Sequence, residues 1–239
     1  EEQSFGDGAA ALVIGDTDVA ATIEEMHSHS DEIFDSWRMI CDNAVQSSED
    51  RFVFAEGYFL NMKEAVAGIL KKSGLQIGDF AKVVYYSPDE RRHRELARQL
   101  GLDKGQIQNA MSDSLGNTGC AYALMMLVAA LEAAKPGERI LFVNYGGGAD
   151  AYIFTATDRI EKGKGHKGIE GHLASKMPLP SYETYIRFRE LMPVGLQRRP
   201  EVVSSTTQLW RDRQWIIGAY ASKCRDCGFI HFPPQRVCL

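Results

Sequence analysis

Short apolar runs alternate with apolar stripes at helical spacing along the first 158 residues. The runs are bounded by turn residues and predict strands over 9–14, 19–23, 82–86, 140–144 and 151–157. The stripes predict helices over 55–72, 89–100 and 121–134. Gly74 should end the first helix, and Asp89 and Gly101 should begin and end the second. The first two strands are joined by a short turn and should form a hairpin. This order of elements predicts an α/β fold.

The helix predicted over 121–134 is apolar on nearly every side until Glu132, which is typical of a helix buried between two sheets. It is too short to cross a bilayer. Asn117 lies where the preceding loop becomes this helix. Its side chain either caps the helix, the commoner role of asparagine there, or points its amide into a cleft beyond the loop.

Two further loops follow strand ends. Tyr86 ends the strand predicted over 82–86, and α/β proteins build their sites at the carboxyl ends of strands. The glycines of Tyr145-Gly-Gly-Gly148 let the backbone approach a neighbour closely. A tight hairpin is favoured over a phosphate cradle, because a strand and not a helix follows the glycines.

The composition changes after residue 158. Residues 161–171 are rich in glycine and lysine and predict a flexible linker, so we divide the chain into a domain over 1–158, a linker over 159–178 and a second domain over 179–239. Ser181 should cap a helix in this last part. The bulky side chains around Trp210 and Trp215 indicate either docking against a neighbouring surface or a hydrophobic core of this domain itself.

The sharpest local motif is the pair Cys224 and Cys227, followed by Gly228. Two thiolates at this spacing bind one tetrahedral metal, and the glycine permits the turn, so the motif predicts a structural zinc site with Cys238 as a third ligand. A fourth ligand from a second such pair would fall two residues beyond the end of the sequence. His231 is an alternative fourth ligand, but its place in a short strand favours an outward-facing side chain.

Several other cysteines and histidines have a structural and a chemical interpretation. We interpret Cys41 and Cys120 as packed core residues, with a reactive thiol at a helix start as the alternative for Cys120. His93 is interpreted as a solvent-facing helix residue, with a general base as the alternative. His27 and His29 are interpreted as polar loop residues rather than a metal pair, because no third ligand is near.

The overall composition narrows the function classes. The chain has 239 residues, of which 44% are hydrophobic, and a net charge of −5, which weighs against a nucleic-acid footprint. No apolar run is long enough for a membrane span, and we expect a cytoplasmic protein. Five cysteines with one close pair favour metal binding in a reducing compartment over disulfides. A strand at one end and an interrupted cysteine pattern at the other indicate a part of a longer protein.

A set of motifs together resembles the C-terminal half of the thiolase superfamily, in the branch of hydroxymethylglutaryl-CoA synthase and ketoacyl-carrier-protein synthase III. The motifs are Phe5-Gly-Asp-Gly-Ala-Ala-Ala, Glu56-Gly-Tyr58, Tyr85-Tyr-Ser-Pro88, Gly116-Asn-Thr118, Lys135-Pro-Gly-Glu-Arg-Ile140 and Tyr145-Gly-Gly-Gly148. Residues from 179 onward resemble the start of an acyl-CoA-associated zinc-ribbon and OB-fold domain. The resemblance implies half of a layered αβαβα fold, followed by a helix and a truncated zinc ribbon.

The resemblance implies Claisen-type chemistry on acyl-CoA thioesters in a homodimer, while the net charge and the short apolar runs argue against nucleic acid and membranes as partners. A cysteine of the N-terminal half would carry the acyl group. Asn117 falls on the family's asparagine, and Gly147 or Gly148 would supply a backbone N–H near the nucleophile. The family's histidine position is Tyr86 here, and a phenol with a pKa of about 10 is a hydrogen-bond donor and a poor general base at neutral pH.

Three hypotheses follow. The first is an acyltransferase that makes or breaks carbon–carbon bonds on acyl-CoA thioesters, which the resemblance of Asn117 and the glycine loop favours. The second is a catalytically silent thiolase-like scaffold with a zinc-ribbon module that binds acyl-CoA, which Tyr86 favours. The third is a zinc-ribbon nucleic-acid binder, which the acidic net charge weighs against.

Overall fold

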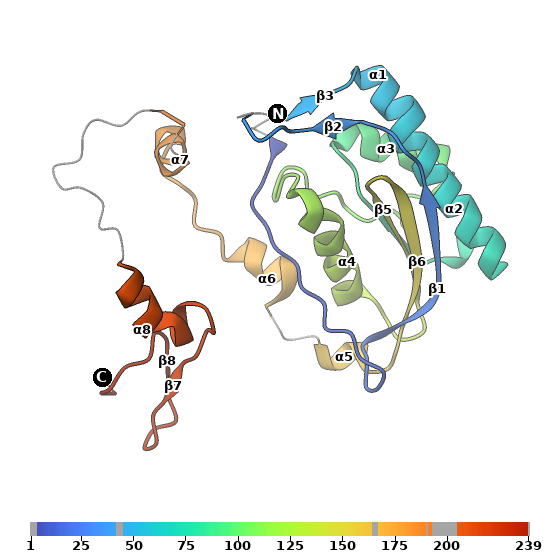
Figure 1. Cartoon of the computed structure of the whole chain (residues 1–239). Coiled ribbons are helices and arrows are strands. Elements are labelled where there is room, and N and C mark those ends of the chain that lie inside the picture. Colours follow the sequence, from blue (N-terminus) through green and yellow to red (C-terminus); the bar gives the residue numbers. More distant parts are fainter. Residues whose placement is uncertain (1–3, 42–44, 164–166, 190, 193–204, 239) are drawn as a thin grey trace. The chain divides into compact units, whose positions relative to one another are not determined.

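The computed structural model describes the chain except residues 1–3, 42–44, 164–166, 190, 193–204 and 239. The chain divides into two compact units, Glu1–Met177 and Pro178–Leu239, each with its own elements (Figure 1). Among the described residues, no helix combines the length and the apolar character needed to cross a membrane.

A four-stranded sheet in the order β1-β6-β5-β4 forms the centre of the first unit (Figure 1). Its strands are β1 (Ala21–Ser30), β4 (Lys82–Tyr85), β5 (Arg139–Tyr145) and β6 (Gly148–Ala156). β1 and β5 run antiparallel to β6, and β4 runs parallel to β5. Tyr145 pairs with Ala149, which confirms the hairpin interpretation of the glycine loop.

One long helix covers each face of this sheet, as Figure 1 shows. α2 (Leu60–Ser73) packs on β1, β6 and β5, and α4 (Tyr122–Ala133) packs on β4 and β5. A π-helical stretch, Val53–Phe59, leads into α2. α2 ends at Gly74, whose φ of 73° is the left-handed conformation that glycine adopts without strain. The structure confirms both predicted helices and the predicted stop.

Each long helix has its own core. The core under α2 contains the buried side chains of Tyr58, Met62, Ile69, Leu96, Leu141 and Ile153. The core under α4 contains those of Tyr122, Met126, Leu127, Ile140 and Phe142. β5 supplies both cores, because successive side chains of a strand point to opposite faces of the sheet. Burial on both faces explains the unbroken apolar run that predicts this strand.

The helix α3 (Glu90–Gln99) begins just beyond β4. The carboxylate of Asp89 accepts the backbone N–H of Arg92 at 2.9 Å, so Asp89 caps the helix as predicted. β4 and β5 are parallel neighbours, so Tyr86 and Tyr145 leave the sheet at the same edge. Their rings stack with centroids 6.5 Å apart.

The other elements of the first unit are short. They are β2 (Ser36–Trp37), β3 (Gln46–Ser47), α1 (Asp50–Phe52), the 3-10 turns Ile77–Asp79 and Gly119–Ala121, α5 (Ile160–Gly163) and α6 (Gly168–Ala174). β2 and β3 pair with each other and form a ribbon separate from the main sheet.

The N-terminal segment differs from the prediction. Residues 9–14 form no strand, and the side chains of Val13 and Ile14 are 101% and 89% exposed. The predicted hairpin is wrong because the second predicted strand pairs with β6 instead and continues to Ser30 as β1. His27 and His29 therefore lie in a strand and not in a loop.

The segment 159–178, which the sequence predicts to be a linker, contains α5 and α6. Ile160 and Ile169 are buried, and the N–H of Ile169 donates to the carboxylate of Glu132 on α4 at 2.8 Å. The first compact unit accordingly extends to Met177. The glycine and lysine content of this segment predicts a linker, but the two buried isoleucines pack it on the first unit.

The second unit contains two helices and a small ribbon. α7 (Tyr182–Phe188) follows Ser181 at its N-cap position, and α8 (Thr206–Ile216) begins after Ser205, whose hydroxyl accepts the N–H of Gln208 at 3.2 Å. The ribbon consists of β7 (Ser222–Lys223) and β8 (Ile230–His231), which pair antiparallel. Trp215 of α8 packs edge to face on Phe232 with ring centroids 6.3 Å apart.

Candidate functional site

The structure brings Asn117 and Tyr86 together at the edge where β4 and β5 end. The amide Nδ2 of Asn117 donates to the hydroxyl of Tyr86 at 3.3 Å and to the carbonyl of Pro88 at 3.4 Å. Its Oδ1 accepts the backbone N–H of Gly119 at 2.9 Å, in the 3-10 turn that opens α4. Asn117 therefore tethers the turn before the helix and also points its amide toward Tyr86.

The backbone around Asn117 is clamped by the N-terminal segment. The N–H of Asn117 donates to the carbonyl of Ser4 at 2.9 Å, and the carbonyl of Asn117 accepts the N–H of Gly6 at 3.0 Å. Gly116 adopts a φ of +76°, and a Cβ there would lie 3.0 Å from the carbonyl oxygen of Ser4. Glycine is thus needed before Asn117 both for the backbone conformation and for the close approach of a second segment.

Aromatic rings surround Tyr86. The rings of Tyr58, Tyr122 and Tyr145 have centroids 6.4, 6.2 and 6.5 Å from that of Tyr86, and the hydroxyl of Tyr58 donates to the carbonyl of Tyr86 at 2.7 Å. Burial raises the pKa of Tyr86 above its ordinary value, and the hydrogen bond with Asn117 opposes part of that rise. Tyr86 is consequently a neutral phenol at pH 7, able to donate a hydrogen bond.

The glycine loop is shaped by the packing of its hairpin. Gly148 adopts a φ of +104°, and a Cβ there would lie 2.0 Å from the carbonyl oxygen of His29 on β1. Gly147 adopts a φ of +63° and is exposed. The N–H of Gly146 donates to the carbonyl of Gly148 at 2.9 Å. These contacts account for the glycines as a tight turn, and an additional role of Gly147 or Gly148 in binding an oxyanion stays a prediction.

Three interpretations of single residues are wrong. Cys120 and Cys41 are exposed rather than packed in a core. Cys120 lies in the 3-10 turn before the buried part of α4, where the side chains still face outward. His93 is 3% exposed rather than solvent-facing, because its ring stacks on Tyr85 and its Nε2 lies 2.9 Å from the carbonyl oxygen of Gln108.

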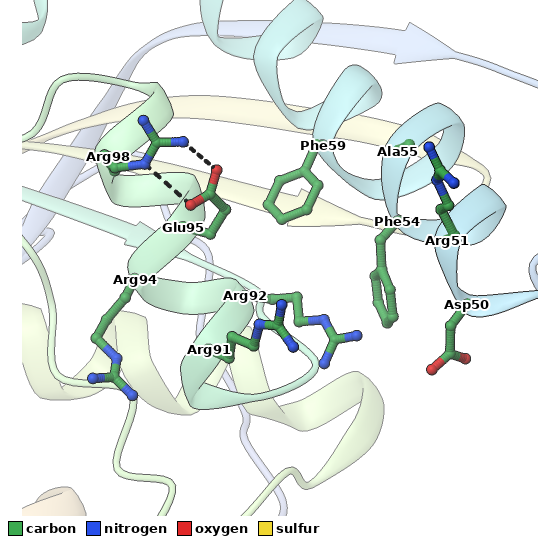
Figure 2. A pocket seen from close by; sticks show the side chains of 10 residues that line it. All are labelled: Asp50, Arg51, Phe54, Ala55, Phe59, Arg91, Arg92, Arg94, Glu95 and Arg98. Atoms are coloured by element: carbon green, nitrogen blue, oxygen red, sulfur yellow. Dashed lines mark hydrogen bonds and ion pairs between the residues drawn. The ribbon is translucent and has the colours of Figure 1, made fainter.

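A hollow of about 710 Å³ lies between α3 and the segment from Asp50 to Phe59 (Figure 2). Arginine side chains predominate in its lining: Arg51, Arg91, Arg92, Arg94 and Arg98. Phe54 and Phe59 give it an apolar wall, and the guanidinium of Arg92 lies 4.1 Å above the ring of Phe54. A surface of this kind suits an anion with an apolar portion.

Carboxylates engage some of these arginines. Arg92 binds Asp89 at 2.8 Å, and Arg98 binds Glu95 at 2.6 Å. The hydrogen bond with Arg98 lowers the pKa of Glu95 to about 2. The hollow was not predicted from the sequence, although four arginines within one helix, which begins four residues after Tyr86, indicate a cationic surface there.

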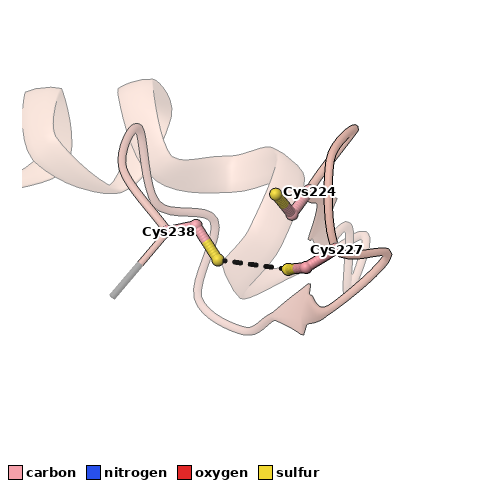
Figure 3. A group of neighbouring side chains, drawn as sticks. All are labelled: Cys224, Cys227 and Cys238. Atoms are coloured by element: carbon pink, nitrogen blue, oxygen red, sulfur yellow. Dashed lines mark hydrogen bonds between the residues drawn. The ribbon is translucent and has the colours of Figure 1, made fainter.

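The second unit gathers three cysteines, as Figure 3 shows. The sulfur atoms of Cys224, Cys227 and Cys238 all lie within 4.8 Å of one another, and those of Cys227 and Cys238 are 3.5 Å apart. The turn between the first two cysteines closes through the N–H of Gly228, which donates to the carbonyl of Cys224 at 3.1 Å. Gly228 adopts a φ of +74°, so the predicted requirement for glycine is met.

The electrostatics of this cluster suit a metal cation. The backbone N–H groups of Cys227 and Asp226 lower the pKa of the Cys224 thiol to about 7, while the neighbouring thiols of Cys227 and Cys224 raise the pKa of Cys238. A bound cation would favour the deprotonated form of all three, and thiolates are preferred ligands of zinc. The donor set therefore fits the metal predicted from the sequence.

His231 does not face away from the cluster, so the interpretation of an outward-facing side chain is wrong. Its Nε2 lies 3.3 Å from the sulfur of Cys238. The cross-strand pairing of His231 with Ser222 places its side chain on the face of the ribbon toward which residues 235–238 return.

Comparison with known families supports these two regions separately. Residues 70–154 match the family described as the C-terminal domain of 3-oxoacyl-[acyl-carrier-protein] synthase III. Residues 220–239 match the family described as the rubredoxin-like zinc ribbon domain of ChsH2.

Curated relatives agree with the first match. The chain is 35% identical over 164 residues to the hydroxymethylglutaryl-CoA synthase of Methanopyrus kandleri, which covers 67% of this chain and 47% of the relative. It is 34% identical over 193 residues to the enzyme of the same name from Aeropyrum pernix, covering 79% of this chain and 53% of the relative. The chain thus spans about half the length of the curated relatives it matches.

Solved structures show the same fold at low identity. PksG, a hydroxymethylglutaryl-CoA synthase from Bacillus subtilis, is 18% identical with a TM-score of 0.59, and the match covers 71% of this chain and 46% of that protein. 3-Oxoacyl-[acyl-carrier-protein] synthase III from Aquifex aeolicus is 19% identical with a TM-score of 0.51, covering 59% and 46%. The resemblance of the chain to the C-terminal half of thiolase-superfamily enzymes, followed by a zinc ribbon, is therefore confirmed, and the α/β fold with it.

Proposed function

We propose that the whole protein makes or breaks carbon–carbon bonds on acyl-CoA thioesters. The first unit of this chain resembles the C-terminal half of thiolase-type condensing enzymes, which catalyse reactions of this class. The contact between Asn117 Nδ2 and Tyr86 Oη at 3.3 Å is the observation that carries this proposal. It joins two hydrogen-bond donors at the carboxyl ends of parallel strands, where α/β proteins build their sites. The curated relatives named hydroxymethylglutaryl-CoA synthase support this class of reaction.

Asn117 and Tyr86 would act as donors to the thioester oxygen of the second substrate. As a carbon–carbon bond forms or breaks next to a thioester, negative charge develops on that oxygen, and fixed donors stabilise it. The hydroxyl of Tyr86 can turn from Asn117 toward such an oxygen, because a phenol is both donor and acceptor. Gly147 or Gly148 would add a backbone N–H near the acyl group, which a cysteine of the N-terminal half would carry.

The arginine-lined hollow would hold the anionic part of the coenzyme. The phosphates of coenzyme A need several cationic donors, and guanidinium groups bind phosphate with two parallel hydrogen bonds. The hollow places Arg91 and Arg51 beside the wall of Phe54, which could pack on the adenine. Arg91 follows Tyr86 by five residues, so the reacting end and the anionic end of one thioester would lie near one loop.

The second unit would bind zinc through Cys224, Cys227 and Cys238. The zinc-ribbon match over residues 220–239 and the close approach of three sulfurs support this proposal. Zinc coordinated by cysteines stabilises the turn that carries them, and a fourth protein ligand would close the tetrahedral site to a substrate.

The replacement of the family's histidine by Tyr86 supports a second candidate function. A scaffold that binds acyl-CoA through its zinc-ribbon unit without condensing it would not need a base at this position. Incubation of the full-length protein with short acyl-CoA thioesters separates the two candidates. The condensing enzyme should gain the mass of one acyl group on one cysteine, whereas a protein that gains no adduct from any thioester would be the scaffold.

A further inference from the structure

We infer that His231 is a positioning residue of the metal centre, which donates a hydrogen bond from Nε2–H to the sulfur of Cys238. The distance between the two atoms is 3.3 Å, which is short for an N–H···S hydrogen bond and places the imidazole directly beside this thiol. The inference rests on the zinc site proposed above and is independent of the acyl-transfer proposal.

Three contacts fix the imidazole in this place. His231 pairs with Ser222 across the ribbon, which orients its side chain relative to β7. The ring of Phe229 packs edge to face on the imidazole with centroids 4.8 Å apart. The hydroxyl of Ser222 accepts the N–H of Gln235 at 3.1 Å and so holds the turn that leads to Cys238. The two partners of the hydrogen bond are thus each anchored to β7.

The arrangement of the cysteines favours a hydrogen-bond donor over a fourth ligand. Among the described residues, the group whose donor atoms all lie within 4.8 Å of one another consists of Cys224, Cys227 and Cys238 and does not include His231. Its Nε2 contacts the group from the side of Cys238. We therefore assign the imidazole to one ligand of the metal, the sulfur of Cys238.

A donor to Cys238 has a clear chemical use. Cys238 is exposed, and a thiolate in water is prone to protonation and to loss of its metal. A hydrogen bond from N–H to the thiolate spreads its negative charge and holds the sulfur toward the other two cysteines. Groups that support metal ligands in this way typically contribute about 10- to 100-fold in metal affinity.

The test compares zinc affinity in the full chain and in His231→Phe, measured at one pH by competition with a chromogenic chelator. Phenylalanine keeps a planar ring against Phe229 and removes the donor. We expect the affinity to fall by about 10-fold or more while one zinc still binds at saturation. His231→Gln retains an N–H donor and should recover much of the loss, and His172→Phe, in the first unit, should leave the affinity unchanged.

Cobalt substitution separates positioning from ligation. In His231→Phe the d–d bands of bound Co²⁺ should stay as in the parent chain, because the ligands are the same, while the sulfur-to-cobalt charge-transfer band shifts. A change in the d–d bands, or failure to saturate with one ion, would make His231 a ligand and overturn the inference. An affinity within about twofold of the parent would also overturn it, since outer contacts of this kind contribute at least ~10-fold.

The two proposals fail in different ways. A parent chain that binds no zinc would remove the zinc site, and the role of His231 with it. If the parent chain binds zinc and His231→Phe has the same affinity and the same charge-transfer band, only the role of His231 is contradicted. If His231→Phe does not fold, His231→Gln decides, because an affinity in that variant as low as in Cys238→Ser would contradict a donor role.

Discussion

Single residues at the candidate active site have more than one task. Asn117 is not the cap of α4, whose N-cap is Ala121, but it holds the turn before α4 through its Oδ1 and reaches Tyr86 through its Nδ2. This local role is compatible with the proposed role of its amide at an active site. Tyr86 is predicted to stand at the histidine position of the family that the chain resembles, and burial keeps its hydroxyl protonated. The chemistry available to this pair is hydrogen-bond donation rather than proton abstraction at neutral pH.

We predict that Tyr86→Phe in the full-length protein lowers turnover by about 10²-fold, the usual effect of removing one donor to an oxyanion. Acyl transfer to the cysteine should stay largely intact, because it precedes the step that needs this donor. Steady-state rates and the acyl-enzyme mass measure the two steps. Tyr152→Phe, in β6, is the matched control and should have no effect. An unchanged turnover in Tyr86→Phe would show that the hydroxyl has no catalytic role.

Tyr58 predicts how stability responds to alkaline pH. Burial raises its pKa well above the ordinary value, so the unfolded chain ionises first as the pH rises. The neutral phenol contributes its full stability below the unfolded pKa of about 10, and this contribution is lost above that value. We therefore expect the free energy of unfolding of the chain to fall above about pH 10 in urea titrations.

Tyr58→Phe should make this alkaline decline shallower. The variant should also lose about 1 kcal/mol at neutral pH, because the hydroxyl of Tyr58 donates to the carbonyl of Tyr86 at 2.7 Å. Equal slopes above pH 10 in the parent and in Tyr58→Phe would contradict the assignment of the decline to this residue.

At the scale of elements, α3 links the candidate active site to the arginine-lined hollow. The helix begins at the loop that carries Tyr86 and presents four of the arginines of the hollow. Figure 2 shows Arg91 and Arg92 extending toward Phe54 in the segment that precedes α2, whereas Arg94 points away from it and Arg98 pairs with Glu95. A ligand in the hollow would be bound by one helix that is fixed to the sheet by the burial of His93 and Leu96.

We predict that Arg91→Ala in the full-length protein raises the KM for an acyl-CoA by about 10-fold, the usual loss for one charge-assisted hydrogen bond to phosphate. The same acyl group on pantetheine, which lacks the nucleotide phosphates, should show no change. Lys71→Ala, at the end of α2, is the matched control. An equal loss with both thioesters would mean that the substitution disturbs α3 and not a phosphate contact.

The sequence predicts elements well where an apolar pattern and its end residues agree. α2 with Gly74, α3 with Asp89 and the hairpin around Gly148 are such cases. The prediction failed over residues 9–14, because an apolar run resembles a buried strand whether or not a partner strand pairs with it. It also failed for His93 and Cys120, since exposure of one residue in a helix or turn depends on packing partners that no local pattern specifies.

At the scale of the whole chain, the two compact units are stabilised by different means. The first unit, Glu1–Met177, has a sheet with a core on each face. The described residues of the second unit, Pro178–Leu239, include no fully buried side chain, so a bound metal should dominate its stability. The second unit can therefore lose its structure while the sheet of the first unit stays folded.

This difference predicts a selective effect of metal removal. A chelator should abolish the structure of the second unit and leave the thermal transition of the first unit unchanged. The double variant Cys224→Ser, Cys227→Ser should have the same effect and should lack the roughly one equivalent of zinc that the parent chain binds. Two of the three tryptophans, Trp210 and Trp215, lie in the second unit. Their fluorescence, recorded in a Trp37→Phe background, reports on that unit, and far-ultraviolet circular dichroism reports chiefly on the first.

The control for this experiment is Cys120→Ser, which removes an exposed thiol from the first unit and should leave zinc content and tryptophan fluorescence unchanged. Loss of the sheet signal on chelation would contradict independent units, because metal bound in the ribbon would then stabilise the first unit as well. Zinc retained in the double serine variant would place the metal outside the cysteine cluster. Selective loss of the tryptophan signal is expected because the three cysteine sulfurs lie close enough to bind one ion. The described residues of the second unit form no buried core that would keep it folded once that ion is removed.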